Sequence, residues 1–205
     1  MPDLHKALAD IDAIKRQVAR DTQFRGYGPA TIAFTGVLAL VAAVVQALWI
    51  DDPREQFAGY LAIWIGTAAI SVALIGAETV TRSRRLHSDL ADEMIHAAIE
   101  QLIPAGVAGA LLTFVLLRFA PDTVWIMPGF WQIFFGLGVF ASCRILPRAL
   151  FAAGVWYLAS GLVCIALAAD GDPWSPWAMG IPFGVGQFII AGILHHALGA
   201  TDGDE

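Results

Sequence analysis

The stretch PATIAFTGVLALVAAVVQALWI, residues 29–50, contains no charged side chain and is long enough to cross a membrane. At about 1.5 Å per residue, roughly 20 helical residues span the ~30 Å hydrocarbon layer of a bilayer. Five further apolar stretches of similar length follow. The sequence therefore predicts an all-α membrane domain over residues 29–198, with six transmembrane helices at Pro29–Ile50, Phe57–Ala77, Gln101–Ala120, Thr123–Ser142, Ala149–Ala169 and Pro176–Leu198.

The composition agrees with a membrane protein. Hydrophobic residues make up 58% of the 205-residue chain, well above the share in an ordinary soluble domain. The formal net charge is −6, which does not suggest a nucleic-acid partner. The first 20 residues are polar and charged, so we expect no cleavable signal peptide.

The basic residues are distributed unequally about the predicted spans. Short loops rich in Lys and Arg remain in the cytoplasm, so their positions set the topology. Two of the 12 basic residues, Arg54 and Arg118, fall on the outer side. We therefore expect both termini to be cytoplasmic, on the side that holds Lys6, Lys15, Arg16, Arg20, Arg25, Arg82, Arg84, Arg85, Arg144 and Arg148.

The outer connections are short, so they predict three helical hairpins between consecutive spans. They centre on Asp51-Asp52-Pro53, Ala120-Pro121-Asp122 and Asp170-Gly171-Asp172-Pro173. Tryptophans near these connections fit the membrane interface, and closely spaced glycines in the spans predict close helix packing. The tryptophans are Trp49, Trp125, Trp174 and Trp177, and the glycines include Gly106, Gly109, Gly136, Gly138, Gly180, Gly184 and Gly186.

Residues 1–28 are predicted to form a cytoplasmic amphipathic helix, at Asp3–Gln23, followed by the Gly26–Pro29 hinge. Apolar residues recur on one face of the helix. That face could lie on the lipid surface, pack on a cytoplasmic protein or a second copy of the chain, or fold back on the protein's own loops. The contact residues are predicted to be Leu4, Leu8, Ile11, Ile14 and Val18.

Residues 78–100 are predicted to be a cytoplasmic helical extension between the second and third spans. Glu93, His96 and Glu100 share one helical face, with the Glu-x-x-His spacing found in carboxylate-bridged metal proteins. His195 or His196 could complete a metal site, and haem between His96 and one of them is a variant. The alternative is ion pairing, in which Asp92, Glu93 and Glu100 pair with Arg82, Arg84 and Arg85.

The spans themselves contain few groups that could perform chemistry. No Asp, Glu, Lys, Arg or His lies in the central part of any span, which disfavours proton or ion coupling. Neutral polar residues at Thr67, Ser71 and Gln187 could line a path for a small neutral or apolar solute. Cys143 and Cys164 are predicted at different depths, so we expect no disulfide between them.

Three stretches resemble a family of uncharacterised bacterial inner-membrane proteins with six helices. They are DLHKALADIDAIKRQVARDTQFRGYGPAT from Asp3, HSDLADEMIHAAIEQLIPA from His87 and PWAMGIPFGVGQ from Pro176. The resemblance implies a multi-pass protein of the inner membrane and supplies no catalytic residues.

The leading hypothesis is therefore a non-enzymatic membrane protein with a cytoplasmic binding or regulatory face. The alternatives are a metal- or haem-dependent membrane enzyme with its site at the cytoplasmic edge and a passive transporter of a small neutral or apolar solute. Separately, residues 199–205 are predicted to form an acidic C-terminal tail.

Overall fold

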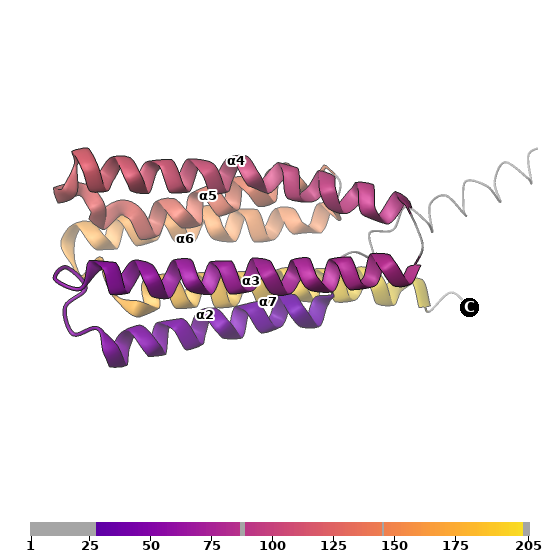
Figure 1. Cartoon of the computed structure of the whole chain (residues 1–205), viewed down its shortest axis with the longest axis horizontal. Coiled ribbons are helices and arrows are strands. Elements are labelled where there is room, and N and C mark those ends of the chain that lie inside the picture. The colour runs from indigo at the N-terminus through magenta and orange to yellow at the C-terminus, as the bar shows by residue number, and fades with distance from the viewer. Residues whose placement is uncertain (1–27, 87–88, 145, 203–205) are drawn as a thin grey trace, which may run out of the picture.

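The computed structural model describes residues 28–86, 89–144 and 146–202, except the side chains of residues 82–86, 89–99, 170 and 198–202. Throughout these residues the chain is a bundle of long helices and has no strand (Figure 1). Two short 3₁₀ helices, η1 (Pro121–Ile126) and η2 (Arg148–Leu150), precede α5 and α6. The long helices are α2 (Pro29–Trp49), α3 (Phe57–Leu86), α4 (Asp89–Phe119), α5 (Met127–Ser142), α6 (Phe151–Asp170) and α7 (Pro176–Asp202).

Six helical segments are long and apolar enough to cross a membrane, as the sequence predicts. The fourth segment, Pro121–Ser142, combines η1 with α5. α3 continues past its candidate span, Phe57–Thr81, and α4 begins before its own, Glu100–Phe119. The predicted amphipathic helix, with Leu4, Leu8, Ile11, Ile14 and Val18, lies outside the described residues.

Local sequence signals set several helix starts and turns. Pro29 occupies the first turn of α2, where its missing N–H would have no partner in the helix anyway. In the turn before α3, the Asp52 carboxylate accepts a hydrogen bond from the Arg54 backbone N–H at 2.8 Å. Asp172 does the same for the Trp174 N–H at 3.0 Å before α7. These hydrogen bonds between a side chain and the backbone two residues later stabilise the tight turns before α3 and α7.

The helices are arranged in two groups joined at α6 and α7. Figure 1 shows α2, α3 and α7 on one side of the bundle and α4, α5 and α6 on the other. The consecutive pairs expected as hairpins are in contact, but the most extensive packing joins α2 with α7 and α5 with α6. α3 and α4 touch each other least among the neighbouring helices.

Glycines allow α5 and α6 to approach at the level of their backbones. A Cβ on Gly129 would lie 2.6 Å from the Gly161 carbonyl oxygen, and one on Gly161 would lie 2.6 Å from the Gly129 oxygen. Two turns away, a Cβ on Gly136 would lie 3.1 Å from the Gly154 oxygen. The two glycine pairs therefore form an antiparallel seam that larger side chains would force apart.

The α2–α7 contact uses small residues in the same way. A Cβ on Gly36 would lie 3.0 Å from the Gly184 carbonyl oxygen. A Cβ on Gly180 would lie 2.5 Å from the Ala43 methyl group. The predicted packing role of Gly180 and Gly184 is therefore visible in the structure, where both lie against α2.

Two details differ from the sequence-based expectation. A Cβ on Gly106 would meet no atom within 4 Å, so this glycine does not mark a helix contact. Trp174, in the turn before α7, is 4% exposed, so its ring is buried against neighbouring helices and does not face the surroundings. Its ring packs edge-on against Phe57 at 5.3 Å and Tyr60 at 5.1 Å between centroids, which shields it from the surroundings.

Candidate functional site

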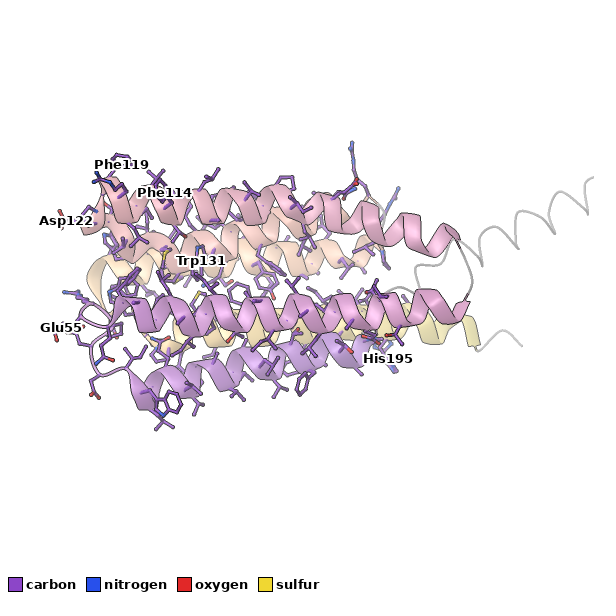
Figure 2. The ribbon with its side chains drawn as sticks, in the orientation of Figure 1. Glu55, Phe114, Phe119, Asp122, Trp131 and His195 are labelled. Carbon is purple, nitrogen blue, oxygen red and sulfur yellow. The ribbon has the colours of Figure 1, made fainter. Side chains whose placement is uncertain are left out.

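The bundle has two chemically different ends. The basic end is defined by the start of α2, the connections from α3 to α4 and from α5 to α6, and the C-terminal part of α7. The turn end contains residues 51–56, 120–126 and 171–175. Figure 2 shows His195 toward the basic end, and Glu55 and Asp122 at the turn end. The predicted metal or haem site belongs to the basic end.

Three predicted ligands of this site have described side chains, and all three are exposed: Glu100, His195 and His196. The two histidine rings lie 6.1 Å apart between centroids. The side chains of Glu93 and His96 lie outside the described residues, as do those in the alternative ion-pair scheme at Arg82, Arg84, Arg85 and Asp92.

The predicted ligands lie on α4 and α7, and these two helices pack mainly against different neighbours. α4 packs chiefly on α5, whereas α7 packs chiefly on α2. Among the residues that the structure describes, no three His, Cys, Asp or Glu side chains are grouped to hold a metal ion. The metal or haem site stays a prediction, which metal analysis and a visible absorption spectrum of the purified protein would test.

A carboxylate lies where the N-terminal segment enters the bundle. Glu78 of α3 packs directly against Gly28, the residue that caps the start of α2, and a Cβ on Gly28 would collide with the carboxylate. The negative charge is favourable there because the first turn of a helix presents partly positive N–H groups. Glycine at position 28 thus allows the start of α2 to lie directly against α3, a contact that the sequence pattern did not reveal.

The two cysteines are free, which confirms the expectation that they form no disulfide. Cys143 lies just after α5 at the basic end, and its thiol donates to the Val139 carbonyl oxygen at 3.3 Å. Burial raises the pKa of the Cys143 thiol, because the thiolate would lose hydration. This cysteine is therefore a poor nucleophile at neutral pH.

A glutamine that sequence reasoning missed connects three parts of the turn-end half. Gln46 is 1% exposed in α2. Its Nε2 donates to the Trp174 carbonyl oxygen at 2.8 Å, and its Oε1 accepts from Trp64 Nε1 at 2.7 Å. Both ends of the amide are satisfied, so its role is to tie α2 to α3 and to the start of α7.

A second missed glutamine compensates for a proline. Pro182 lies inside α7 and has no N–H, so the carbonyl of Ala178 four residues earlier loses its usual helical partner. Gln132 of α5 fills this role, because its Nε2 donates to the Ala178 oxygen at 2.8 Å. A single glutamine within an apolar span, with a proline inside another, was the signal that could have indicated such a pair.

The structure shows the local contacts of the residues predicted to line a solute path, and the path itself stays a prediction. Thr67 donates to the Ile63 carbonyl oxygen and Ser71 to the Thr67 oxygen, both within α3. Gln187 lies at the α2–α7 contact, where its Cβ would be 3.1 Å from a Cβ on Gly36. These three side chains therefore take part in intrahelical bonds and helix packing.

Comparisons of the chain with protein-family models, curated proteins and solved structures found no match. The resemblance to six-helix inner-membrane proteins accordingly stays a prediction.

Proposed function

We propose that this chain is a non-enzymatic protein of the bacterial inner membrane whose basic end faces the cytoplasm and binds a partner. One observation carries the proposal. In the six candidate spans, every Asp, Glu, Lys, Arg and His lies within four residues of an end of its span. The middle of the bundle therefore offers no ionisable group of these types for catalysis or coupling, whereas the ends hold them.

The helices α3 and α4 favour the basic end over the turn end as the binding face. Their helical residues extend beyond the spans at the basic end, as far as Leu86 in α3 and back to Asp89 in α4. Charged residues are frequent in this extension, which includes Asp92 and Glu93, and Glu100 follows at the start of the α4 span. At the turn end, by contrast, the connections are short and are closed by local hydrogen bonds.

The contact between Gly28 and Glu78 supports a role for the N-terminal segment in this proposal. Gly28, directly before α2, lies against α3 close to the end of its candidate span. An amphipathic helix at Asp3–Gln23 would then lie beside the same face. We infer that its residues Leu4, Leu8, Ile11, Ile14 and Val18 contact the partner, which is a protein or the anionic lipid surface.

Deletion of residues 1–23 from the otherwise intact protein tests this function. The proteins and lipids that co-purify with the wild-type and shortened chains would be compared quantitatively. We expect the deletion to remove specific components. A matched control neutralises two charges at the turn end, with Glu55→Gln and Asp122→Asn, and should leave the set unchanged. An identical set in the deletion, or an equal loss in the control, would contradict the proposal.

A further inference from the structure

Arg118 is a cation near the turn end that the fold itself does not pair. It lies in the last turn of α4, as the penultimate residue of the candidate span Glu100–Phe119, and its side chain is exposed. The central carbon of its guanidinium lies 5.5 Å from the centroid of the Phe119 ring. Among the side chains that the structure describes, no carboxylate forms an ion pair with Arg118. Its charge is therefore available to a group outside the chain.

The guanidinium of Arg118 offers more than a charge. A cation in the last turn of a helix complements the partly negative carbonyl groups there, but that role needs no particular donor geometry. The planar fork of N–H groups in arginine matches the oxygens of a phosphate, which it can bind with two parallel hydrogen bonds. In the described part of the chain, no acceptor receives a hydrogen bond from this fork. The free fork favours a phosphate ligand.

Two exposed tryptophans mark the level of the membrane boundary at the same end of the bundle. Trp49 is the last residue of the first candidate span, Trp177 is the second residue of the sixth, and both rings are exposed. Tryptophan is enriched where the lipid tails meet the headgroups. Arg118 holds the corresponding place in the third span, one residue before its end. Its guanidinium therefore lies at the level of the lipid phosphates.

Below Arg118, the same face of α4 presents a strip of apolar side chains. Phe114, Leu111 and Val107 precede Arg118 by four, seven and eleven residues, so all four share one helical face. Each of the three apolar side chains is at least half exposed, and Figure 2 shows Phe114 and Phe119 on α4 close to the turn end. The strip extends about 16 Å from Arg118, which is half of a ~30 Å hydrocarbon layer. Its length thus matches one acyl chain of one leaflet.

The charges of the turn end select the type of phospholipid. Five acidic residues lie there with one basic residue, Arg54. This excess of negative charge repels a headgroup whose only charge is its phosphate, and it attracts the ammonium group of a zwitterionic headgroup. The preference comes from the five carboxylates together, so no single one is required. They are Asp51, Asp52, Glu55, Asp122 and Asp172.

We propose that the outer face of α4 binds a zwitterionic phospholipid of the phosphatidylethanolamine type in the leaflet at the turn end. The fork of Arg118 holds the phosphate, and one acyl chain lies along Phe114, Leu111 and Val107. The inference rests on the six helices crossing a bilayer. It does not rest on the partner binding proposed for the basic end, so each can fail without the other.

Native mass spectrometry of the full-length protein tests the site. The probe is an equimolar mixture of phosphatidylethanolamine and phosphatidylglycerol with identical acyl chains, added to the protein in mild detergent. We expect the wild type to retain more phosphatidylethanolamine than phosphatidylglycerol, and Arg118→Gln to retain severalfold less of the former. Arg54→Gln is the matched control, because it removes an exposed positive charge from the turn itself, and it should behave as the wild type. Equal retention by the wild type and Arg118→Gln, an equal loss in Arg54→Gln, or a preference for phosphatidylglycerol would overturn the proposal.

Thermal unfolding of the same three proteins separates lipid binding from a role inside the helix. A ligand that binds the folded protein raises its unfolding temperature. Added phosphatidylethanolamine should therefore raise the unfolding temperature of the wild type and of Arg54→Gln by more than that of Arg118→Gln. If Arg118 only complements the end of α4, Arg118→Gln unfolds at a lower temperature by the same amount with and without the lipid. That result would contradict the proposal.

Discussion

The glycines of α5 and α6 differ sharply from those of α3 in how closely another helix approaches them, although both sets lie in apolar spans. Gly129 and Gly161 face each other so closely that a methyl group on either would meet the other's backbone. Gly66 and Gly76 of α3 face open space, with nothing within 4 Å of an added Cβ. Glycine in a membrane helix is thus evidence of contact only where an opposing backbone occupies the space of its side chain.

The same contrast divides the bundle into a core and two outer helices. In α2, α5, α6 and α7, 33% to 39% of span residues are buried, against 11% in α3 and 17% in α4. A tryptophan hydrogen bond supplements the packing of each outer helix. Trp64 of α3 donates to Gln46 of α2, and Trp131 of α5 donates to Thr113 of α4 at 2.9 Å (Figure 2 labels Trp131). The core is held by backbone approach, whereas the outer helices depend more on side chains.

The largest expected effect comes from filling the glycine seam. Gly161→Leu would place a side chain where the Gly129 carbonyl oxygen lies, so α5 and α6 must separate. We expect a loss of roughly 3 kcal/mol or more of unfolding free energy. The matched variant Gly66→Leu enters open space and should change it by less than about 0.5 kcal/mol. Equal losses, measured by denaturant titration in detergent, would remove the distinction between core and outer helices.

Gln132→Leu is expected to lower the free energy of unfolding by a smaller amount. This change leaves the Ala178 carbonyl without either its helical donor or the glutamine, and we expect a loss of about 1–2 kcal/mol. The control is Gln56→Leu, at an exposed position in the turn before α3. If the two variants unfold at the same denaturant concentration, the proline in α7 does not need compensation by α5.

Removing one tryptophan bond should loosen α3 alone. Trp64→Phe keeps an aromatic ring in the core but leaves Gln46 Oε1 unpaired, at a cost of about 1 kcal/mol. Trp49→Phe alters a ring that is 75% exposed and should be nearly neutral. Unfolding would be monitored by circular dichroism in detergent. A neutral Trp64→Phe would indicate that packing by itself attaches α3 to the core.

The smallest effect concerns reactivity at the edge of the core. Because burial raises the pKa of Cys143, its thiolate fraction at neutral pH is lower than that of a solvated cysteine. In a Cys164→Ala background, the alkylation rate of Cys143 should therefore be low at pH 7. It should continue to rise with pH after the alkylation rate of a solvated model thiol has reached its plateau. A pH profile that coincides with that of the model thiol would contradict the assigned burial.

The sequence predicts the spans well because hydropathy and length decide them locally. Pro29 and Pro176 even mark helix starts within one residue of the structure. The pairing of α2 with α7 has no such signal, since lipid is as apolar as a neighbouring helix and hydropathy cannot distinguish the two. Gly106 and Gly184 look alike in sequence, yet α2 packs only against the latter.

The polar residues of the core were harder to predict than the spans. Gln46 and Gln132 acquire their partners from segments more than 40 residues away, at Trp174 and Ala178. A local pattern does not report such contacts. The proposed contact residues of the N-terminal helix and the ligands Glu93 and His96 stay predictions, because their side chains lie outside the described residues.

The most direct test of the division between core and outer helices is disulfide cross-linking in membranes. In a Cys143→Ser, Cys164→Ala background, one protein would carry Gly36→Cys with Gln187→Cys, whose Cβ atoms lie 3.1 Å apart across α2 and α7. The other would carry Gly66→Cys with Gly106→Cys, which face open space on α3 and α4. Allowed disulfides have Cβ separations of about 3.5–4.5 Å, so only the first pair is within reach after a small shift. We predict efficient oxidation of the first pair and none of the second within one chain. Failure of the first pair, or equal oxidation of both, would contradict the account.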